Sequence, residues 1–152
     1  MAVTGFLFTK YLASIHGGIT GAEARQIDFL SDAIKGMLAT ATWVPSRDVH
    51  QFKTDVTNEI TGTGYTAGGN VLANKTITVD GATHSVRLDA DDLSWPGSTF
   101  TARYCILYDD RAAAAADKEL IGYIDFGQNE SVAGATFTVQ FAAEGIIKHV
   151  VG

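Results

Sequence analysis

The sequence predicts a mainly β protein, a compact antiparallel β-sandwich or barrel with a short N-terminal helix. Seven or so short segments have the pattern of strands, and turn signals separate them every 8–12 residues or so. Hydrophobic residues make up 46% of the 152 residues and charged residues 18%, which suits a folded core and not a disordered chain. We expect residues 1–152 to form one domain, with a helix and arm in residues 1–27 and a β-rich body in residues 28–152.

The helix is predicted from Val3 to His16. Five apolar residues cluster on one side of a 3.6-residue period: Phe6, Leu7, Tyr11, Leu12 and Ile15. Thr4 is its expected cap, and Gly17-Gly18 is its expected end. The apolar stripe has two interpretations. It packs on the domain's own core, which we favour, or it docks on a neighbouring subunit.

A strand and one turn of helix are predicted next. Asp32 to Trp43 mixes small and apolar residues as a strand does. Trp43-Val44-Pro45 ends it, because proline cannot donate to a ladder and restricts the residue before it. Ser46 or Asp48 is expected to cap a turn of helix around Val49 to Val56.

A β-hairpin follows. Val71 to Val79 alternates and is rich in β-branched residues, and Thr83 to Leu88 is its expected return strand. Asp80-Gly81 between them has the composition of a type I′ turn. Asp91-Asp92 and Trp95-Pro96-Gly97 are expected to connect the hairpin to the next strand.

Four further strands account for most of the remaining chain. They are predicted at Phe100 to Tyr108, Leu120 to Phe126, Ala135 to Phe141 and Ile146 to Val151. Asp109 to Lys118 is expected to be a loop whose alanines form at most a helical turn. Gly127 is expected to end the strand before it, and Glu144-Gly145 to form the last turn.

Charge and cysteine content argue against several classes of partner and site. The net charge of −6 repels a phosphate backbone, so nucleic acid is not an expected partner. The single cysteine, Cys105, excludes an internal disulfide and predicts a small core residue in mid-strand. No apolar run reaches the ~20 residues that span a bilayer, so no membrane association is expected. The low charge content predicts that a partner covers part of the surface.

No residue pattern predicts an active site, so we assign no catalytic, cofactor-binding or metal-binding residue and expect no cofactor. The glycine-rich loop at residues 62–69 lacks the Gly-Lys-Ser/Thr of a phosphate loop, and its glycines are interpreted as turn residues. The histidines lack the spacing of a helical metal motif. Two aspartate clusters are interpreted as turn formers, with calcium binding as the alternative: Asp89, Asp91 and Asp92, then Asp109 and Asp110.

Six strings of residues carry a resemblance to a known family. They are Phe52 to Gly69, Ser98 to Tyr104, Leu107 to Asp110, Leu120 to Gly127, Phe137 to Phe141 and Glu144 to Ile147. In their order they resemble a family of tailed-bacteriophage virion structural proteins, of the capsid decoration or minor head protein type. The resemblance covers most of the chain from about residue 28 onward. It implies a structural component of the particle and no catalytic residues.

We therefore expect a bacteriophage virion structural protein that is not an enzyme, and we favour a capsid decoration (cement) protein on the capsid exterior, assembled in the host cytoplasm. Its expected partners are the major capsid protein and further copies of itself, with a trimer favoured, because symmetry multiplies shallow contacts. The alternative is a tail, connector or receptor-binding component of the virion. A carbohydrate hydrolase is the third hypothesis, with Asp89, Asp92 and Glu59 as its candidate carboxylates.

Overall fold

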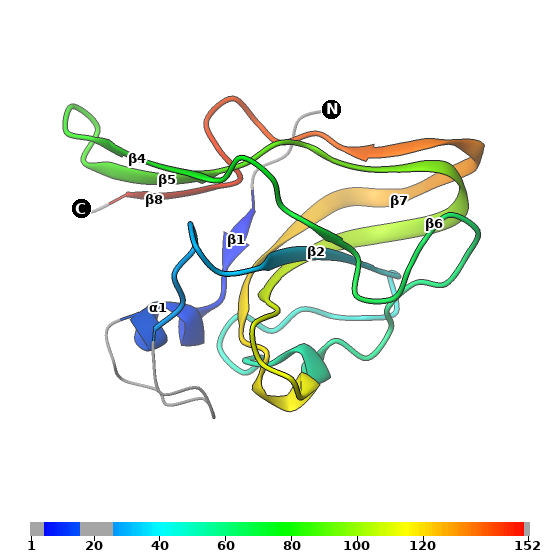
Figure 1. Ribbon diagram of the computed structural model, residues 1–152, viewed down its shortest axis with the longest axis horizontal. Coiled ribbons are helices and arrows are strands. Elements are labelled where there is room, and N and C mark those ends of the chain that lie inside the picture. The colour runs from blue at the N-terminus through cyan, green and yellow to red at the C-terminus, as the bar shows by residue number, and fades with distance from the viewer. Residues whose placement is uncertain (1–4, 16–25, 151–152) are drawn as a thin grey trace.

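The computed structural model describes residues 5–15 and 26–150, which form two antiparallel sheets and one short α-helix (Figure 1). The predicted β-sandwich is confirmed, and neither sheet closes into a barrel. In chain order the elements are β1 (Phe6–Leu7), α1 (Thr9–Ile15), β2 (Ile34–Ala39), the 3₁₀ turn η1 (Lys53–Asp55), β3 (Asn70–Val71), β4 (Thr76–Asp80), β5 (Ser85–Asp89), β6 (Leu93–Asp109), the 3₁₀ turn η2 (Ala115–Asp117), β7 (Leu120–Val139) and β8 (Ile147–Val150).

The larger sheet has the strand order β1-β7-β6-β2-β3, and the smaller has the order β4-β5-β8. The long pair β6 and β7 folds over at the right of Figure 1, so that this one ribbon contributes to both layers. The register of the pair is irregular between Trp95 and Ser98, and Gly127 and Gly134 adopt positive φ values of 81° and 65°. Such irregularities bend a strand and increase its twist.

The core lies between the two layers. Gly36 in β2 and Gly122 in β7 have no side chain there, and the space is taken by Leu93 and Ile147 from the opposite layer. Inside the bend of the ribbon four rings cluster, with centroid separations between 5.1 and 6.2 Å: Tyr65, Trp95, Phe100 and Phe137. Rings at such distances gain from tilted and edge contacts beyond their burial.

The other face of the larger sheet is covered by the segment that follows β2. Trp43 packs edge-on against Tyr104 and Tyr123, at 5.3 and 6.0 Å between ring centroids. Its indole Nε1 donates to the Asp55 carbonyl at 3.0 Å. Trp43 thus buries a large ring without leaving its polar atom unsatisfied.

The N-terminal prediction was correct in part. The segment predicted as one helix holds β1, which pairs with β7, and then the shorter helix α1. Most of the predicted stripe packs on the protein's own core, since Tyr11 is buried and three partly buried residues pack against the core cluster: Leu7, Leu12 and Ile15. Phe6 is the exception and is 47% exposed. Thr4, His16 and Gly17-Gly18, the expected cap and end, lie outside the described residues.

The segment from Asp32 to Val56 forms less regular structure than predicted. The strand ends at Ala39, before Trp43, because the chain turns with the Trp43 amide donating to the Thr40 carbonyl at 3.2 Å. In place of the helical turn predicted around residues 49–56, the structure has the shorter 3₁₀ turn η1. Neither Ser46 nor Asp48 caps it, since Asp55 accepts the amides of Gln51 and Phe52 at 2.7 and 2.9 Å.

The predicted hairpin is confirmed, but its first strand and its turn were wrong. Residues 71–79 break at Asn74, which has a φ of 50°, so that β3 and β4 belong to different sheets. Asp80 pairs with Ser85 across a four-residue loop, in place of a two-residue turn at Asp80-Gly81. The Asp80 carboxylate accepts the amides of Ala82 and Thr83 and so stabilises the longer loop.

Two segments that were predicted to separate strands lie within the long strands β6 and β7. Trp95-Pro96-Gly97 is an irregularity within β6 and not a connection, since Pro96 occupies a position where no ladder partner is paired. Gly127 does not end its strand, because β7 runs from Leu120 to Val139 and includes most of the segment predicted from Ala135. The predicted helical turn among the alanines is confirmed as η2.

Candidate functional site

Each of the three carboxylates proposed for a hydrolase accepts hydrogen bonds from the protein itself. Glu59 pairs with Ala39 at the end of β2, and it accepts hydrogen bonds from the Tyr65 hydroxyl at 2.7 Å and from the Gly68 amide. Asp92 accepts a hydrogen bond from the Phe141 amide at 2.8 Å. The next residue, Leu93, packs its side chain at Gly36. Asp89 accepts the Ala90 amide at 2.9 Å. These carboxylates hold the backbone of separate segments.

In residues 5–15 and 26–150 no group of three or more His, Cys, Asp or Glu side chains is placed to hold a metal ion. Asp91, from the aspartate cluster weighed for calcium, accepts the Asn74 amide group at 2.6 Å. Cys105 is fully buried in β6, and burial raises the pKa of its thiol to about 12. The described helix is also too short to span a bilayer.

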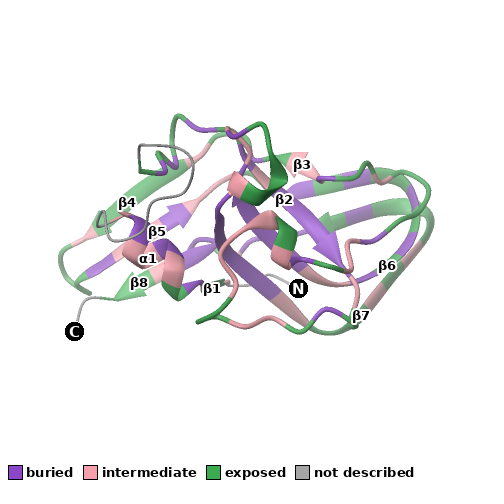
Figure 2. Ribbon diagram, turned by 90° about the horizontal axis from the view of Figure 1, so that it is seen from below, coloured by how far each residue is buried: buried purple, intermediate pink, exposed green. Residues whose placement is uncertain are grey.

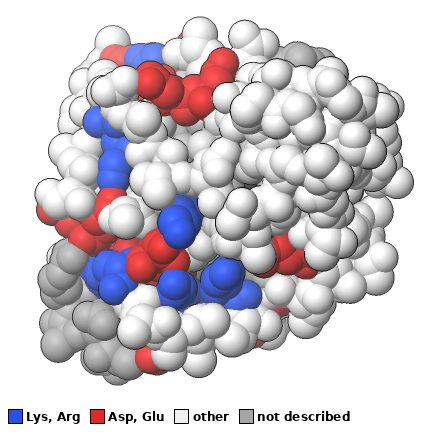
Figure 3. All heavy atoms as spheres, turned by 45° about the vertical axis from the view of Figure 1, so that its right-hand side comes forward, with Lys and Arg blue, Asp and Glu red and all other residues white. Residues whose placement is uncertain are grey.

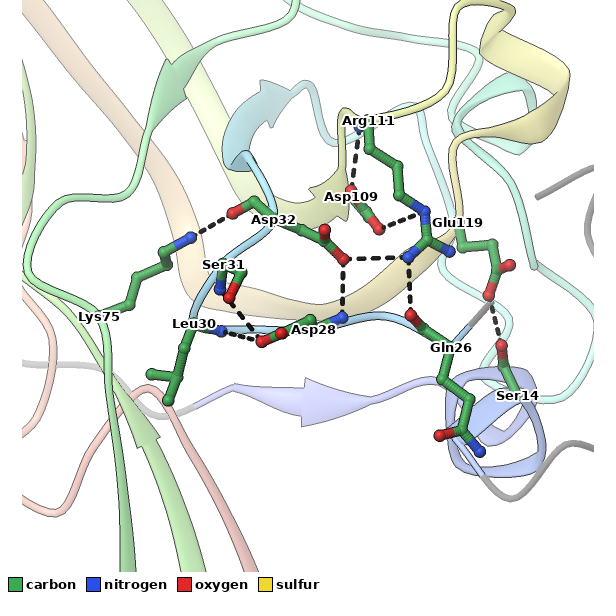
Figure 4. Close-up of polar contacts among 10 residues, drawn as sticks. All are labelled: Ser14, Gln26, Asp28, Leu30, Ser31, Asp32, Lys75, Asp109, Arg111 and Glu119. Atoms are coloured by element: carbon green, nitrogen blue, oxygen red, sulfur yellow. Dashed lines mark hydrogen bonds and ion pairs between the residues drawn. The ribbon is translucent and has the colours of Figure 1, made fainter. Parts of the chain in front are cut away.

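The most concentrated polar cluster surrounds Arg111, just after β6 (Figure 4). Its guanidinium lies between two buried carboxylates, with Nη1 at 3.0 Å from Asp32 and Nε at 3.2 Å from Asp109. Nη1 also donates to the Gln26 carbonyl at 2.8 Å, and the Asp28 amide donates to Asp32 at 2.7 Å. The cluster ties the segment before β2 to the end of β6.

Asp109 is the member of this cluster whose burial is least compensated. Its side chain is 2% exposed, and its Oδ2 atom has no hydrogen bond although Arg111 is close. Burial raises the pKa of Asp109 to about 6, and the nearby charge of Asp32 adds to this, while the Arg111 amide and guanidinium oppose it. The Arg111 cation therefore does not fully offset the burial of Asp109, and this carboxyl holds a proton more tightly than in water.

An Asp109→Asn substitution is expected to change how stability depends on pH. An unfolded aspartate titrates near pH ~3.9, so the native protein binds the Asp109 proton more tightly than the unfolded chain does. The stability contributed by protonated Asp109 is complete below about pH 4 and is lost as the pH rises through about 6. Urea unfolding from pH 4 to 7 or so should show the wild type losing stability relative to the variant in this window. A difference that does not change with pH would contradict the assignment.

A second feature is an almost uncharged end of the molecule. Residues 60–70, 93–102 and 126–141 contain one charged residue, Glu130. The structure places these segments side by side, since Thr63 pairs with Thr99 and residues 93–102 of β6 pair with β7. Figure 3 shows this end as a broad white surface, with the charges gathered elsewhere. Its exposed side chains are small or uncharged: Thr61, Thr63, Ser94, Thr99, Thr101, Ser131, Ala133, Thr136, Thr138 and Gln140.

Within this end, the glycine-rich loop packs closely on β6 because its glycines allow close contact. Gly64 has a φ of 78°, and a Cβ added to it would meet Ser98 at 2.6 Å. The Thr99 amide donates to the Thr63 carbonyl at 3.0 Å. The interpretation of these glycines as turn residues is confirmed, and close backbone approach is a second reason for them.

A shallow groove of about 250 Å³ lies in the uncharged end. Residues of β7 and the adjoining Gln140 line it, with Phe126 and Val132 before the bend of the strand and Phe137 after it. Glu130 also lines the groove. The Gln128 side-chain amide donates to the Glu130 carboxylate at 2.9 Å, and among the described residues no cation pairs with Glu130. The volume is below the ~300 Å³ of a small ligand site and suits a single side chain of a partner.

No protein-family model, curated protein or solved structure matches the chain. Sequence reasoning missed the Arg111 cluster because Asp109 and Asp110 have the composition of turn formers. The signal for the uncharged end was present, as three segments with almost no charge. What the sequence did not show is that these segments adjoin.

Proposed function

We propose that this protein is a bacteriophage virion structural protein, a capsid decoration (cement) protein. It binds the lattice of the major capsid protein on the capsid exterior, stabilises the head and catalyses no reaction. The observation that carries the proposal is the uncharged end, formed by residues 60–70, 93–102 and 126–141.

An uncharged surface is suited to burial against another protein. Interface cores are depleted of charged residues, because a charge that loses water without a partner is costly. Threonine, serine, alanine and glycine also lose little side-chain entropy when they are covered. The groove beside Glu130 adds a recess for one protruding side chain. Together these features favour a broad, flat contact with a protein lattice.

The choice of a capsid as the partner rests on the resemblance. Four of the strings that resemble phage virion proteins contribute to the uncharged end: Phe52 to Gly69, Ser98 to Tyr104, Leu120 to Gly127 and Phe137 to Phe141. A family whose matching residues form such a surface is consistent with a shared binding role.

A Thr101→Lys substitution is expected to abolish most binding to particles that lack the protein. The lysine places a charge in the uncharged end, and we expect at least a tenfold or so weaker binding. Thr57→Lys is the matched control: both threonines are exposed, and each makes one side-chain hydrogen bond, at 2.7 Å to Ser131 and 3.0 Å to Asn58. Occupancy of the particles is measured by quantitative gel electrophoresis.

Two results would overturn the proposal. If Thr101→Lys binds as well as Thr57→Lys, the uncharged end is not the interface. If purified particles hold only a few copies and labelling places them on the tail, the protein is a tail or connector component. A decoration protein is expected in hundreds of copies, and particles without it are expected to be less stable to heat.

A further inference from the structure

Glu130 is the one charged residue of the uncharged end, and it lines the groove in that end. It is partly buried, whereas residues 127–129, which precede it in β7, are exposed. Figure 2 shows much of the bend of the β6–β7 ribbon, at the right, as exposed. A charge loses water when a partner covers the surface around it, so the chemistry of the partner must account for this carboxylate.

The Glu130 side chain lies on the face of the ribbon that carries apolar residues. Glu130 pairs with Ala102 of β6, and Val132 pairs with Phe100. Both β6 residues are buried, Ala102 at 0% and Phe100 at 7% exposed. Side chains at paired positions point to the same face of a sheet. The carboxylate is therefore placed beside apolar side chains and not among the exposed threonines and serines of the opposite face.

No cation among the described residues neutralises this carboxylate. Arg103 adjoins Ala102 in β6, but Asp125 accepts two hydrogen bonds from its guanidinium, at 2.7 and 3.2 Å. Glu130 accepts one hydrogen bond, from the neutral Gln128 amide to Oε1 at 2.9 Å, which leaves Oε2 available within the described part of the chain. If the uncharged end is covered, the partner has to supply the compensating charge, because a buried unpaired carboxylate is costly.

Two aromatic rings of the groove favour arginine as the source of that charge. Phe126 and Phe137 both line it, with ring centroids 6.0 Å apart and ring planes inclined at 61°. A guanidinium packs on aromatic faces and forms hydrogen bonds to a carboxylate in one plane. A lysine ammonium is more strongly hydrated and loses more when water is excluded.

We propose that this groove binds an arginine side chain of the partner protein, whose guanidinium pairs with Glu130 and packs against Phe126 and Phe137. The inference rests on the proposed function, because covering the uncharged end is what leaves Glu130 in need of a cation. It adds the chemistry of the partner: the capsid lattice presents an arginine to β7. The groove, of about 250 Å³, holds one such side chain.

A Glu130→Gln substitution tests the pair on particles that lack the protein. Glutamine keeps the acceptor for Gln128 and removes the charge, and we expect at least tenfold or so weaker binding. Asp48→Asn is the matched control, because Asp48 is an exposed carboxylate outside the uncharged end that accepts one hydrogen bond, from the Thr9 hydroxyl at 2.7 Å. If Glu130 has no cationic partner, removing its charge relieves a cost. Binding of Glu130→Gln equal to or tighter than that of Asp48→Asn would therefore overturn the proposal.

A titration without particles separates this site from the proposed function. N-acetylarginine N-methylamide is added to ¹⁵N-labelled protein, and amide shifts are followed by NMR. We expect saturable shifts in residues 126–140 with a Kd of about 1–20 mM. The citrulline analogue, which has nearly the same shape and no charge, should bind the wild type about fivefold or more weakly, and Glu130→Gln should weaken the arginine probe to the same extent.

The two experiments fail in different ways. A wild type that binds the arginine probe but not the particles would overturn the proposed function and leave the groove assigned to a basic side chain. Absence of saturable binding, or equal binding of the arginine and citrulline probes, would overturn the site itself. A lysine probe that binds as tightly as the arginine probe would overturn the choice of arginine. The NMR spectra also report whether each variant is folded.

Discussion

Replacing Arg111 with methionine is expected to lower the free energy of unfolding by about 3–5 kcal/mol at neutral pH. Methionine keeps much of the packing but leaves the Asp32 and Asp109 carboxylates buried, 3% and 2% exposed, without the cation between them. Removing one partner of a buried ion pair leaves an uncompensated charge in the interior. The free-energy cost of this charge is larger than the net stabilisation that the intact pair provides. Urea unfolding of the wild type and the variant measures this loss.

The matched control is Arg103→Met. Arg103 also pairs with a carboxylate, Asp125, at 2.7 Å, but both side chains are a quarter to a third exposed and remain solvated. We expect it to cost about 1 kcal/mol or less. The cost of Arg111→Met should also shrink toward pH 5 or so, because protonation of Asp109 removes one of the two charges. Equal losses for the two variants, or a cost that does not fall in acid, would contradict the account of the cluster.

A Gly69→Ala substitution is expected to cost about 2–5 kcal/mol through two separate effects. Gly69 has a φ of 70°, which an alanine adopts only with strain. Its added Cβ would also overlap the Gly36 carbonyl oxygen and lie 2.7 Å from the Met37 Cα in β2. Backbone cannot move aside as a flexible side chain can, so the loop should separate from β2.

Two other glycines separate these effects. Gly127 has a φ of 81° but open space around it, so Gly127→Ala should cost only the ~1–2 kcal/mol of the left-handed backbone. Gly81 has open space and no positive φ, and Gly81→Ala should change stability by about 0.5 kcal/mol or less. Thermal or urea unfolding of the three variants is expected to rank Gly69→Ala as the most destabilising. A Gly127→Ala loss equal to that of Gly69→Ala would show that contact with β2 contributes nothing.

The fold class and most strand positions could be predicted because they depend on local patterns. Alternation in residues 100–108 and 120–126 reflects two faces that pack against different layers. The lengths of β6 and β7 could not be predicted, because Pro96-Gly97 and Gly127 have the composition of turns. Pairing between the two long strands resumes beyond these residues, although Gly97 and Gly127 have positive φ values, and that pairing is a tertiary effect.

The composition of the surface segments could be predicted from the sequence, but their positions in the fold could not. Low charge in residues 93–102 and 126–141 is visible in the sequence, but the bend that makes them one surface is not. The apolar alternation of Ile77 and Val79 indicated a strand, and nothing local showed that it would lie at an edge. Buried charge at Asp109 was missed because the pairing of β2 with β6 brings Asp32 to it, although Arg111 lies only two residues along the chain.

The continuous ribbon of β6 and β7 couples the unfolding of the two layers. Because both strands pass from one layer into the other, the two layers are joined by the backbone of both strands as well as by side-chain packing. Neither layer can unfold without disturbing the other, so urea unfolding of the protein is expected to show a single transition.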